Sequence, residues 1–103
     1  MKPAWFHPAA RAEAIEAAVF YEQQQAGLGA RFTDALAAAV EKIRANPRLY
    51  RIAELDTRKC RLLGFPYGII FRLRDDSIQI VAVMHLHRRP GYWSARGRIA
   101  GEA

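Results

Sequence analysis

The spacing of the apolar residues changes at Asn46-Pro47, and this change limits the possible folds more than any other feature. Before it, large apolar residues recur at intervals of four, four and three, which places one face of a helix at Phe32, Leu36, Val40 and Ile43. After it, apolar residues recur at every second position, as in Ile69, Phe71 and Leu73, which is the spacing of a β-strand. The chain therefore combines a helical first half with a second half made of strands.

The first half is predicted to form a helical hairpin. Pro8 suits the first position of a helix, and Glu13 and Glu16 lie toward the amino end of that helix, where negative charge is favourable. Helical spacing then continues as far as Gly27, and the apolar side of this helix is expected to consist of its alanines with Ile15 and Val19.

Gly27 and Gly29 are expected to break the first helix and turn the chain. The apolar stripe from Phe32 then forms a second helix, with the stripe in the core. Asn46-Pro47 should stop this helix, because proline disfavours helical geometry in the residue before it.

The second half is predicted to contain three strands. Apolar and polar residues alternate over residues 69–74 and again over residues 78–87, and Arg74-Asp75-Asp76-Ser77 between them supplies tight-turn residues. These two strands should pair as an antiparallel hairpin. Residues 59–63 are expected as a preceding strand, and residues 3–6 as a short strand at the start of the chain.

The last strand is apolar on both faces from Ile78 to Val83, which places it in the interior of the sheet. Strict alternation puts His85 and His87 on the same face of this strand as Val81 and Val83. The expected fold is therefore α+β: a short strand, a helical hairpin and a three-strand antiparallel meander, with the helices packed on one face of the sheet.

Size and charge set the class of protein. A length of 103 residues fits a single domain, residues 1–103, with a basic tail from about residue 88. The first 46 residues carry as many acidic as basic side chains, so the net charge of +6 belongs to the second half. A one-sided positive field attracts nucleic acid or an acidic protein.

Several other classes of protein do not fit the sequence. The start of the chain lacks the apolar run of a signal peptide, and no stretch approaches the roughly 18 apolar residues of a membrane span, so a cytoplasmic protein without a membrane partner is expected. Cys60 is the single cysteine, and it is expected to be a buried thiol. The His-x-His pair at His85 and His87 has no third ligand at suitable spacing, so no metal and no cofactor is predicted.

The run from His85 to Arg98 contains two histidines, four arginines, a tyrosine and a tryptophan without an acidic residue. Guanidinium groups hold phosphate oxygens, aromatic rings stack on bases, and imidazole moves protons near neutral pH. The run is equipped to hold RNA and to cut it; the alternative is a basic tail without such a role.

These segments resemble the RelE/ParE toxins of bacterial type II toxin–antitoxin systems. The resemblance covers nearly the whole chain, and its most specific parts are Phe65-Pro66-Tyr67 at the start of a strand and the run from Ala82 to Trp93, which reads Ala-Val-x-His-x-x-Arg-x-Pro-x-Tyr-Trp. It implies a small cytosolic toxin that an antitoxin from the same operon holds inactive, with the fold predicted above.

The family contains two mechanisms, and the resemblance implies different residues for each. RelE-like members cleave messenger RNA on the ribosome without a metal, using basic side chains and a tyrosine or histidine near the carboxyl end, whereas ParE-like members inhibit DNA gyrase. RNA cleavage through the 2′-OH needs a base, cations for the developing charge and an acid. The candidates are Glu54 or His85 as base, Arg58, Lys59, Arg61 and Arg88 as cations, and Tyr92 or His87 as acid.

The candidate catalytic residues are accordingly Arg61, His85, Arg88 and Tyr92, and the candidate binding residues are Arg58, Lys59, Arg89, Trp93 and Arg96. Each also has a structural alternative: a hydrogen-bonded histidine, a solvated strand arginine, or an aromatic pair that packs on the sheet and anchors the tail. The hairpin, the Phe-Pro-Tyr motif and the ending favour the ParE-like branch, so a gyrase-directed toxin is predicted. The alternatives are a ribosome-dependent endoribonuclease and a non-toxic nucleic-acid-binding module.

Overall fold

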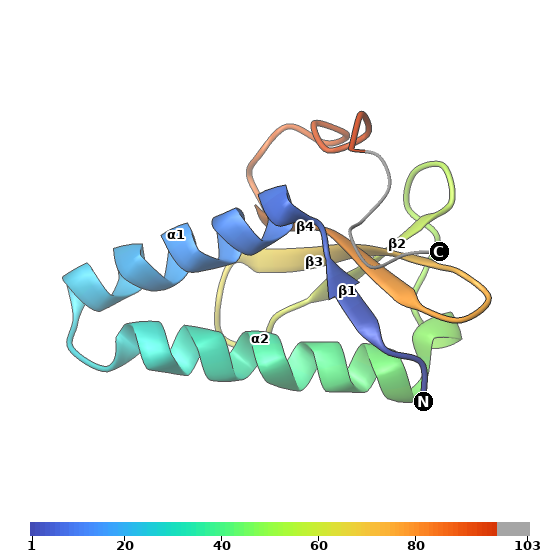
Figure 1. Cartoon of the computed structure of the whole chain (residues 1–103). Helices are drawn as coiled ribbons and strands as arrows, with labels where there is room; N and C mark the ends of the chain where they lie inside the picture. The colour runs from blue at the N-terminus through green and yellow to red at the C-terminus, as the bar shows by residue number, and fades with distance from the viewer. Residues whose placement is uncertain (97–103) are drawn as a thin grey trace.

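A computed structural model describes residues 1–96 of the chain, and it has the α+β architecture expected from the sequence (Figure 1). The elements follow in the order β1 (Ala4–Phe6), α1 (Pro8–Gln24), α2 (Leu28–Ala45), a short 3-10 helix (Pro47–Leu49), β2 (Thr57–Arg61), β3 (Tyr67–Leu73) and β4 (Ile78–His85). The second helix ends directly before Asn46-Pro47, as predicted.

The helical hairpin begins where the sequence predicts and turns at Gly27. Pro8 is the first residue of α1, and the His7 side chain caps this helix by accepting a hydrogen bond from the Ala9 N–H at 3.0 Å. Gly27 has a φ of 86°, a left-handed conformation that favours glycine.

Gly29 does not belong to the break, contrary to the prediction, because it lies in the first turn of α2. A Cβ at this position would stand 2.5 Å from the carbonyl oxygen of Ala18, so only glycine lets the two helices approach this closely. The Glu22 carboxylate of α1 also accepts the Gly29 N–H at 3.0 Å, which satisfies a free amide at the start of α2.

The buried side of α1 also differs from the prediction. Ile15 and Val19 are 58% and 50% exposed, and the buried positions are Ala10 and Ala17. Small side chains on the inner side allow α1 to lie close to α2 and β4, and the larger apolar side chains consequently point outward.

The sheet has the strand order β1-β4-β3-β2, so β4 is an interior strand, as its apolar sequence predicts. β2, β3 and β4 form the expected antiparallel meander, and β1 pairs with β4 in parallel over Ala4–Phe6. β2 begins two residues earlier than predicted, at Thr57, and β4 ends at His85, so His87 lies beyond it.

A β-bulge in β4 reverses the predicted faces of its second half. Phe71 pairs with Ile80 and Ile70 pairs with Ala82, which leaves Val81 as an extra residue. Val81 and Ala82 therefore both contribute to the cluster on one side of the sheet, whereas Ile80 and Val83 contribute to the other. The prediction that Val81 shares a face with Val83 and His85 is wrong for this reason.

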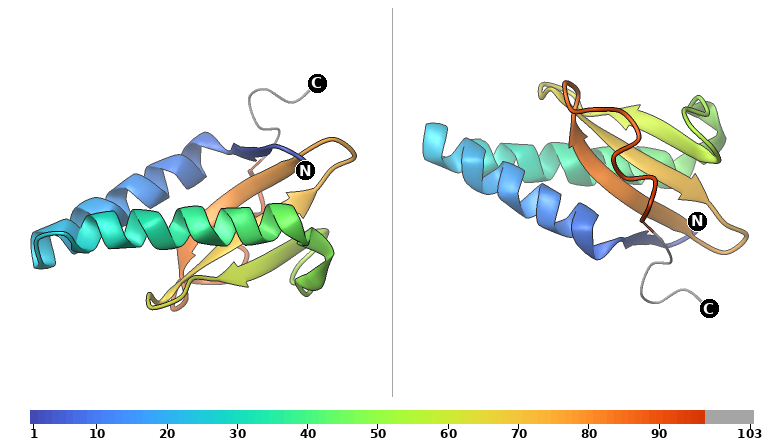
Figure 2. Two further views of the ribbon diagram at one scale, coloured as in Figure 1. Left: turned by 90° about the horizontal axis from the view of Figure 1, so that it is seen from below. Right: turned by 90° about the horizontal axis from the view of Figure 1, so that it is seen from above.

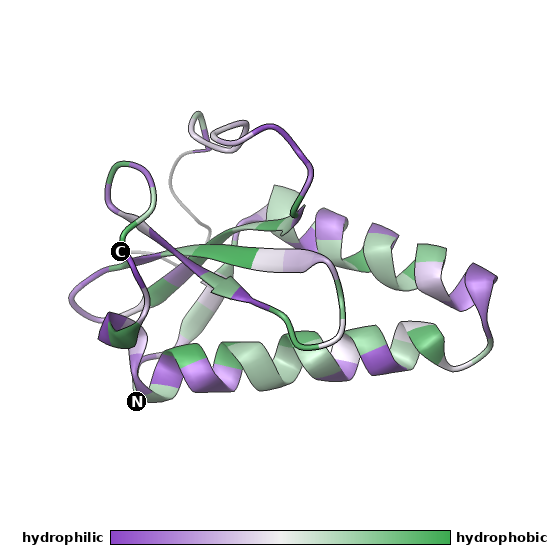
Figure 3. Cartoon of the chain, turned by 180° about the vertical axis from the view of Figure 1, so that it is seen from behind, coloured by the Kyte–Doolittle hydropathy of each residue, from purple (hydrophilic) through white to green (hydrophobic). Residues whose placement is uncertain are grey.

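The two sides of the sheet are covered differently (Figure 2). The hairpin of α1 and α2 lies on one side, which we call the helix face, with a core that contains Phe32, Ile43, Ile69, Phe71 and Ile80. On the opposite side, the outer face, Trp93 packs against Ile70, Val81, Ala82 and Met84. The chain that follows β4 thus covers the outer face; it starts as a hydrophilic stretch beside the hydrophobic strands (Figure 3).

Candidate functional site

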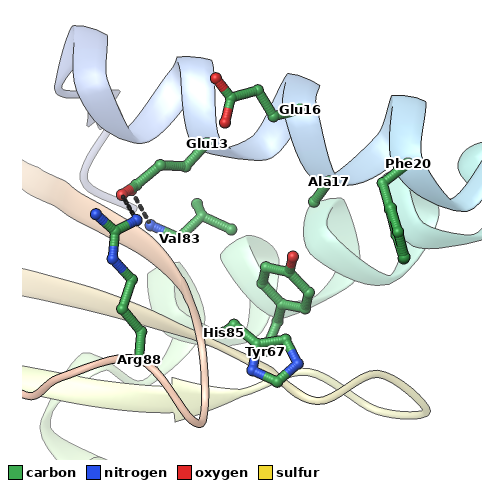
Figure 4. Close-up of a pocket in the computed structure, with 8 residues that line it drawn as sticks. All are labelled: Glu13, Glu16, Ala17, Phe20, Tyr67, Val83, His85 and Arg88. Carbon is green, nitrogen blue, oxygen red and sulfur yellow. Dashed lines mark hydrogen bonds and ion pairs between the residues drawn. The ribbon is translucent and has the colours of Figure 1, made fainter.

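A cavity of about 270 Å³ lies between α1 and the end of β4 (Figure 4). It is lined by Glu13, Glu16, Ala17, Phe20, Tyr67, Val83, His85 and Arg88. Two of the predicted catalytic residues, His85 and Arg88, are therefore brought to one place. In the close-up, the Glu13 carboxylate points toward Arg88 and the backbone of Val83, whereas the Glu16 carboxylate points away from Tyr67 and His85.

Glu13 is the central group of the site, although the sequence analysis gave it only a role at the helix start. Its carboxylate accepts hydrogen bonds from the Val83 N–H at 3.0 Å, the Tyr92 hydroxyl at 2.7 Å and both terminal nitrogens of Arg96 at 2.9 and 2.8 Å. An ion pair to Arg88 at 3.6 Å completes the set.

These contacts determine the charge state of Glu13. Burial alone would raise the pKa of its carboxyl, but the hydrogen bonds from Arg96, Tyr92 and the Val83 amide outweigh burial and lower the pKa below the ordinary value. Glu13 is therefore a stable anion, and its partner Arg96 is held as a cation because the same hydrogen bonds raise the pKa of the guanidinium.

The spacing along α1 contains the signal that could have identified Glu13. Glu13 follows the buried Ala10 by three residues and precedes the buried Ala17 by four, so all three lie on the same side of the helix. A carboxylate on the inner side of an alanine-rich helix requires cationic partners from elsewhere in the fold, and here the run after β4 supplies them.

Tyr92 lies between two arginines and is hydrogen-bonded to Glu13. The Arg88 guanidinium is 3.8 Å from the centroid of the Tyr92 ring, and the Arg96 guanidinium is 5.1 Å from it. Burial and the hydrogen bond to Glu13 strongly raise the pKa of the Tyr92 hydroxyl. A phenol in this environment holds its proton tightly, which makes it a weak acid.

His85 faces the helix side of the sheet, where its ring is 5.2 Å from the ring of Tyr67 and 5.2 Å from that of His87. Its Nδ1 accepts a hydrogen bond from the His87 N–H at 3.1 Å. In the neutral ring this bond leaves the proton on Nε2, so the exposed nitrogen is a donor and not a base. This is one of the structural roles that the sequence analysis kept as an alternative.

Arg61 lies on the opposite side of the sheet from His85. It pairs with Gly68, which pairs with Met84 of the outer-face cluster, and paired residues share a face. Lys59 pairs with Ile70 and lies on the outer face as well. The four predicted catalytic residues are therefore not gathered around one reacting position.

The remaining candidate residues lie in different places on the protein, outside the lining of the cavity. Arg58 is engaged on the helix face, where it donates a hydrogen bond to the Tyr50 carbonyl at 2.7 Å. Arg89 is exposed, and Trp93 is only 2% exposed, so its ring faces are not available to stack on a base. Glu54, the other candidate base, is exposed and lies against Gly91, where a Cβ would stand 2.9 Å from its carboxylate.

The described residues give no indication of a metal centre or of a membrane segment. Over residues 1–96, histidine, cysteine, aspartate and glutamate side chains do not gather in a group of three or more that could hold a metal ion. Neither helix within that range has the length and apolar character needed to cross a membrane.

Comparisons with known proteins identify the class to which this chain belongs. A sequence model of the ParE toxin of the type II toxin–antitoxin system parDE matches residues 5–90. The protein is therefore a toxin of the type II class, and it belongs to the ParE toxin family.

A solved structure described as the chromosomal ParDE TA system from P. aeruginosa is similar, with a TM-score of 0.62 and 21% identity, over 82% of this chain and 96% of that chain. At this level of identity the likeness concerns the fold. The comparison with curated proteins gave no match.

Proposed function

We propose that this ParE-family toxin inhibits DNA gyrase through a basic binding surface, and that a cognate antitoxin neutralises it. Family membership supports the toxin role, and the arrangement of the candidate residues supports binding over RNA cleavage. Cleavage requires a base, a cation and an acid within reach of one phosphate. In this fold, His85 and Arg61 lie on opposite faces of the sheet.

The state of the individual groups supports the same choice, and the engaged His85 nitrogen is the observation that carries it. His85 Nδ1 accepts a hydrogen bond from the His87 backbone N–H, so this nitrogen already has a partner within the protein. The Tyr92 hydroxyl donates a partly buried hydrogen bond to Glu13, and its pKa is raised. Both groups therefore serve the structure around the cavity.

The cations that remain as candidates for binding include Arg61 and Lys59, which lie on the outer face of the sheet. Arg61, Arg88 and Arg89 are exposed, and Lys59 extends over Gly68, with its Cε 3.1 Å from where a Cβ would stand. Exposed guanidinium groups favour an acidic protein surface or a nucleic-acid backbone, and gyrase bound to DNA offers both.

The test is to add the purified toxin to two reactions, gyrase supercoiling and translation of a messenger RNA. We expect inhibited supercoiling and intact messenger. In the double variant Arg61→Ala/Arg89→Ala, inhibition should weaken by about tenfold, equivalent to about 1.4 kcal/mol of binding free energy. His85→Ala should inhibit nearly as well as the unchanged protein. Codon-dependent cleavage of translated RNA that His85→Ala abolishes in a folded protein would establish the ribonuclease alternative.

The antitoxin is proposed to cover the outward side of α1. Ile15 and Val19 are each at least half exposed and lie four residues apart, so they form an apolar strip on one side of the helix. Beside this strip, a groove of about 390 Å³ is lined by Phe6, Arg11, Ala14, Ile15, Ala18, Val19, Thr33 and Leu36. An amphipathic segment would bury the strip, and acidic residues in it would complement the charge of the toxin.

Replacing the strip should weaken the complex without unfolding the toxin. We expect Ile15→Ser/Val19→Ser to reduce co-purification with the antitoxin by about tenfold or more. A matched control is Leu49→Ser/Ile52→Ser, which removes two exposed apolar side chains elsewhere. Equal losses in both variants would contradict the assignment of this surface.

A further inference from the structure

Within residues 1–96, the edge of β4 lacks a neighbouring strand over its second half. β1 pairs with β4 only as far as the Phe6–Ile80 pair, and the His7 N–H then donates to the Ile80 carbonyl at 2.9 Å before the chain enters α1. From Val81 onward, no strand of the described part of the chain pairs with the backbone groups on this side. An open edge of this kind exposes hydrogen-bonding groups to solvent or to another chain.

Two side chains occupy the place of the missing strand. Glu13 accepts the Val83 N–H at 3.0 Å, and Arg96 donates to the Val81 carbonyl at 2.8 Å. These are the donor and the acceptor that a neighbouring strand would otherwise satisfy. Glu13 and Arg96 are themselves joined by two hydrogen bonds, and their side chains are only 13% and 15% exposed.

Apart from the bonds to Glu13 and Val81, few interactions hold the segment 88–96 in place. Its backbone forms short turns, with the Ser94 N–H donating to the Gly91 carbonyl and the Arg96 N–H to the Trp93 carbonyl. Trp93 supplies an apolar contact with the outer face, but an apolar contact does not fix direction. The bonds from Tyr92 and Arg96 to Glu13 are directional and charge-assisted.

We infer that Glu13 is the positioning residue that holds the basic segment 88–96 across the edge of β4, and thereby sets where the cations of this segment are presented to the target. The statement about presentation of the cations to the target rests on the proposed function. The statement that Glu13 holds the segment concerns the toxin alone. Arg88, which stacks on Tyr92 and pairs with Glu13, is the cation most directly placed by this arrangement.

The test compares Glu13→Gln with Glu16→Gln, one turn further along α1. Glutamine keeps the size of the side chain and removes its charge, and Glu16 has no hydrogen bond or ion pair within the described part of the chain. In folded Glu13→Gln, amide hydrogen exchange at Val83 should accelerate by about tenfold or more, while exchange at Ile69 in β3 stays unchanged. Glu16→Gln should leave both amides unchanged.

A spectroscopic measurement reports on the segment itself. The Tyr92 hydroxyl contacts Glu13, and its ring faces Arg88 and Arg96. Loss of the Glu13 charge should lower the pKa of Tyr92 toward the ordinary tyrosine value of 10, as followed by NMR of labelled tyrosine rings. Should Glu13→Gln fail to fold, Arg96→Gln removes the anchor from the other partner and should also accelerate exchange at Val83. The pKa of Tyr92 should not fall in this variant, because the Glu13 charge stays beside the hydroxyl and the opposing charge of Arg96 is lost.

The second part of the inference, the presentation of the cations, is tested by measuring gyrase inhibition. Inhibition should weaken by about tenfold in Glu13→Gln and stay unchanged in Glu16→Gln. Unchanged exchange at Val83 and unchanged titration of Tyr92 in folded Glu13→Gln would overturn the inference. Faster exchange with full gyrase inhibition would overturn its second part. If the unchanged toxin does not inhibit gyrase, the proposed function fails, and the Val83 and Tyr92 measurements alone decide whether Glu13 positions the segment.

Discussion

The two faces of the sheet are stabilised by different interactions. On the helix face, two long helices bury a core in which the rings of Tyr21 and Phe32 contact each other and also those of Phe65 and Tyr67, at 5.0–6.2 Å between centroids. On the outer face, a segment without regular structure covers a smaller cluster, and it is fastened by charged and hydrogen-bonded groups around Glu13.

The outer face also contains buried polar groups that lack hydrogen-bond partners within residues 1–96. The Trp93 Nε1 and the side-chain amide of Gln79 are buried, and neither has a hydrogen-bond partner within residues 1–96. Buried polar groups without partners reduce the net stability that burial provides. The comparison indicates that the helix face determines whether the protein folds, whereas the outer face determines where the basic segment lies.

The largest effect is expected from the helix face. Phe32→Ala removes a fully buried ring from the centre of the aromatic cluster and should reduce the free energy of unfolding by about 3–5 kcal/mol. Chemical denaturation followed by circular dichroism measures this loss. A loss below about 1 kcal/mol would mean that the helix face is not the dominant core.

A smaller effect is expected from the outer face. Trp93→Ala should cost about 2–3 kcal/mol, because the segment can detach and limit the damage that a rigid cavity would cause. Hydrogen exchange should then show faster exchange in Val81 and Met84 with little change in α2. If Trp93→Ala destabilised the protein as much as Phe32→Ala, the two faces would form one cooperative unit, and the distinction drawn above would be wrong.

The pH dependence separates the faces further. The pKa of Glu13 is below its ordinary value of 4.5 in the folded protein, so its contacts stabilise the fold above that pH, and this stabilisation is lost as the pH falls below it. The pKa of Asp56 is lowered as well, since hydrogen bonding by Arg74 and the charge of Arg72 outweigh burial, but this carboxylate is largely exposed and contributes less. Denaturation at pH 6 and at pH 3 should show that Glu13→Gln has a weaker pH dependence than the unchanged protein.

The smallest effect is expected on the outward side of α1. Ile15→Ser/Val19→Ser should change the free energy of unfolding of the isolated toxin by no more than about 0.5 kcal/mol per site, because both side chains are already exposed. Thermal denaturation without antitoxin provides the measurement. A large destabilisation would show that these residues belong to the core of the helix face.

Periodicity predicted the elements well because the helices and strands differ in period and are bounded by strong signals. Pro8, Gly27 and Asn46-Pro47 mark the ends of the helices where the structure has them. The interior position of β4 also followed from its sequence, since a strand that is apolar on both sides has to be covered on both sides.

What the sequence could not show were the faces of β4 and the inner side of α1. A bulge changes no residue type, and in β4 both sets of alternating positions are apolar, so the shift at Val81 leaves no trace in the pattern. In α1 the larger apolar residues favoured the wrong side, because the close approach at Gly29 requires alanines there. The site around Glu13 depends on a contact between positions 83 residues apart, which local patterns do not encode.

The bulge at Val81 also affects how relatives of this toxin can be compared. A homologue of the same length whose β4 is regular, without the bulge, would carry its equivalent of His85 on the outer face and its equivalent of Met84 toward α1, although an alignment would match the two motifs letter for letter. A histidine conserved at this column could then belong to the α1 cavity in one lineage and to the opposite surface in another. Transferring a catalytic assignment between branches of the family therefore requires knowing whether β4 is bulged or regular before the histidine, as well as the histidine itself.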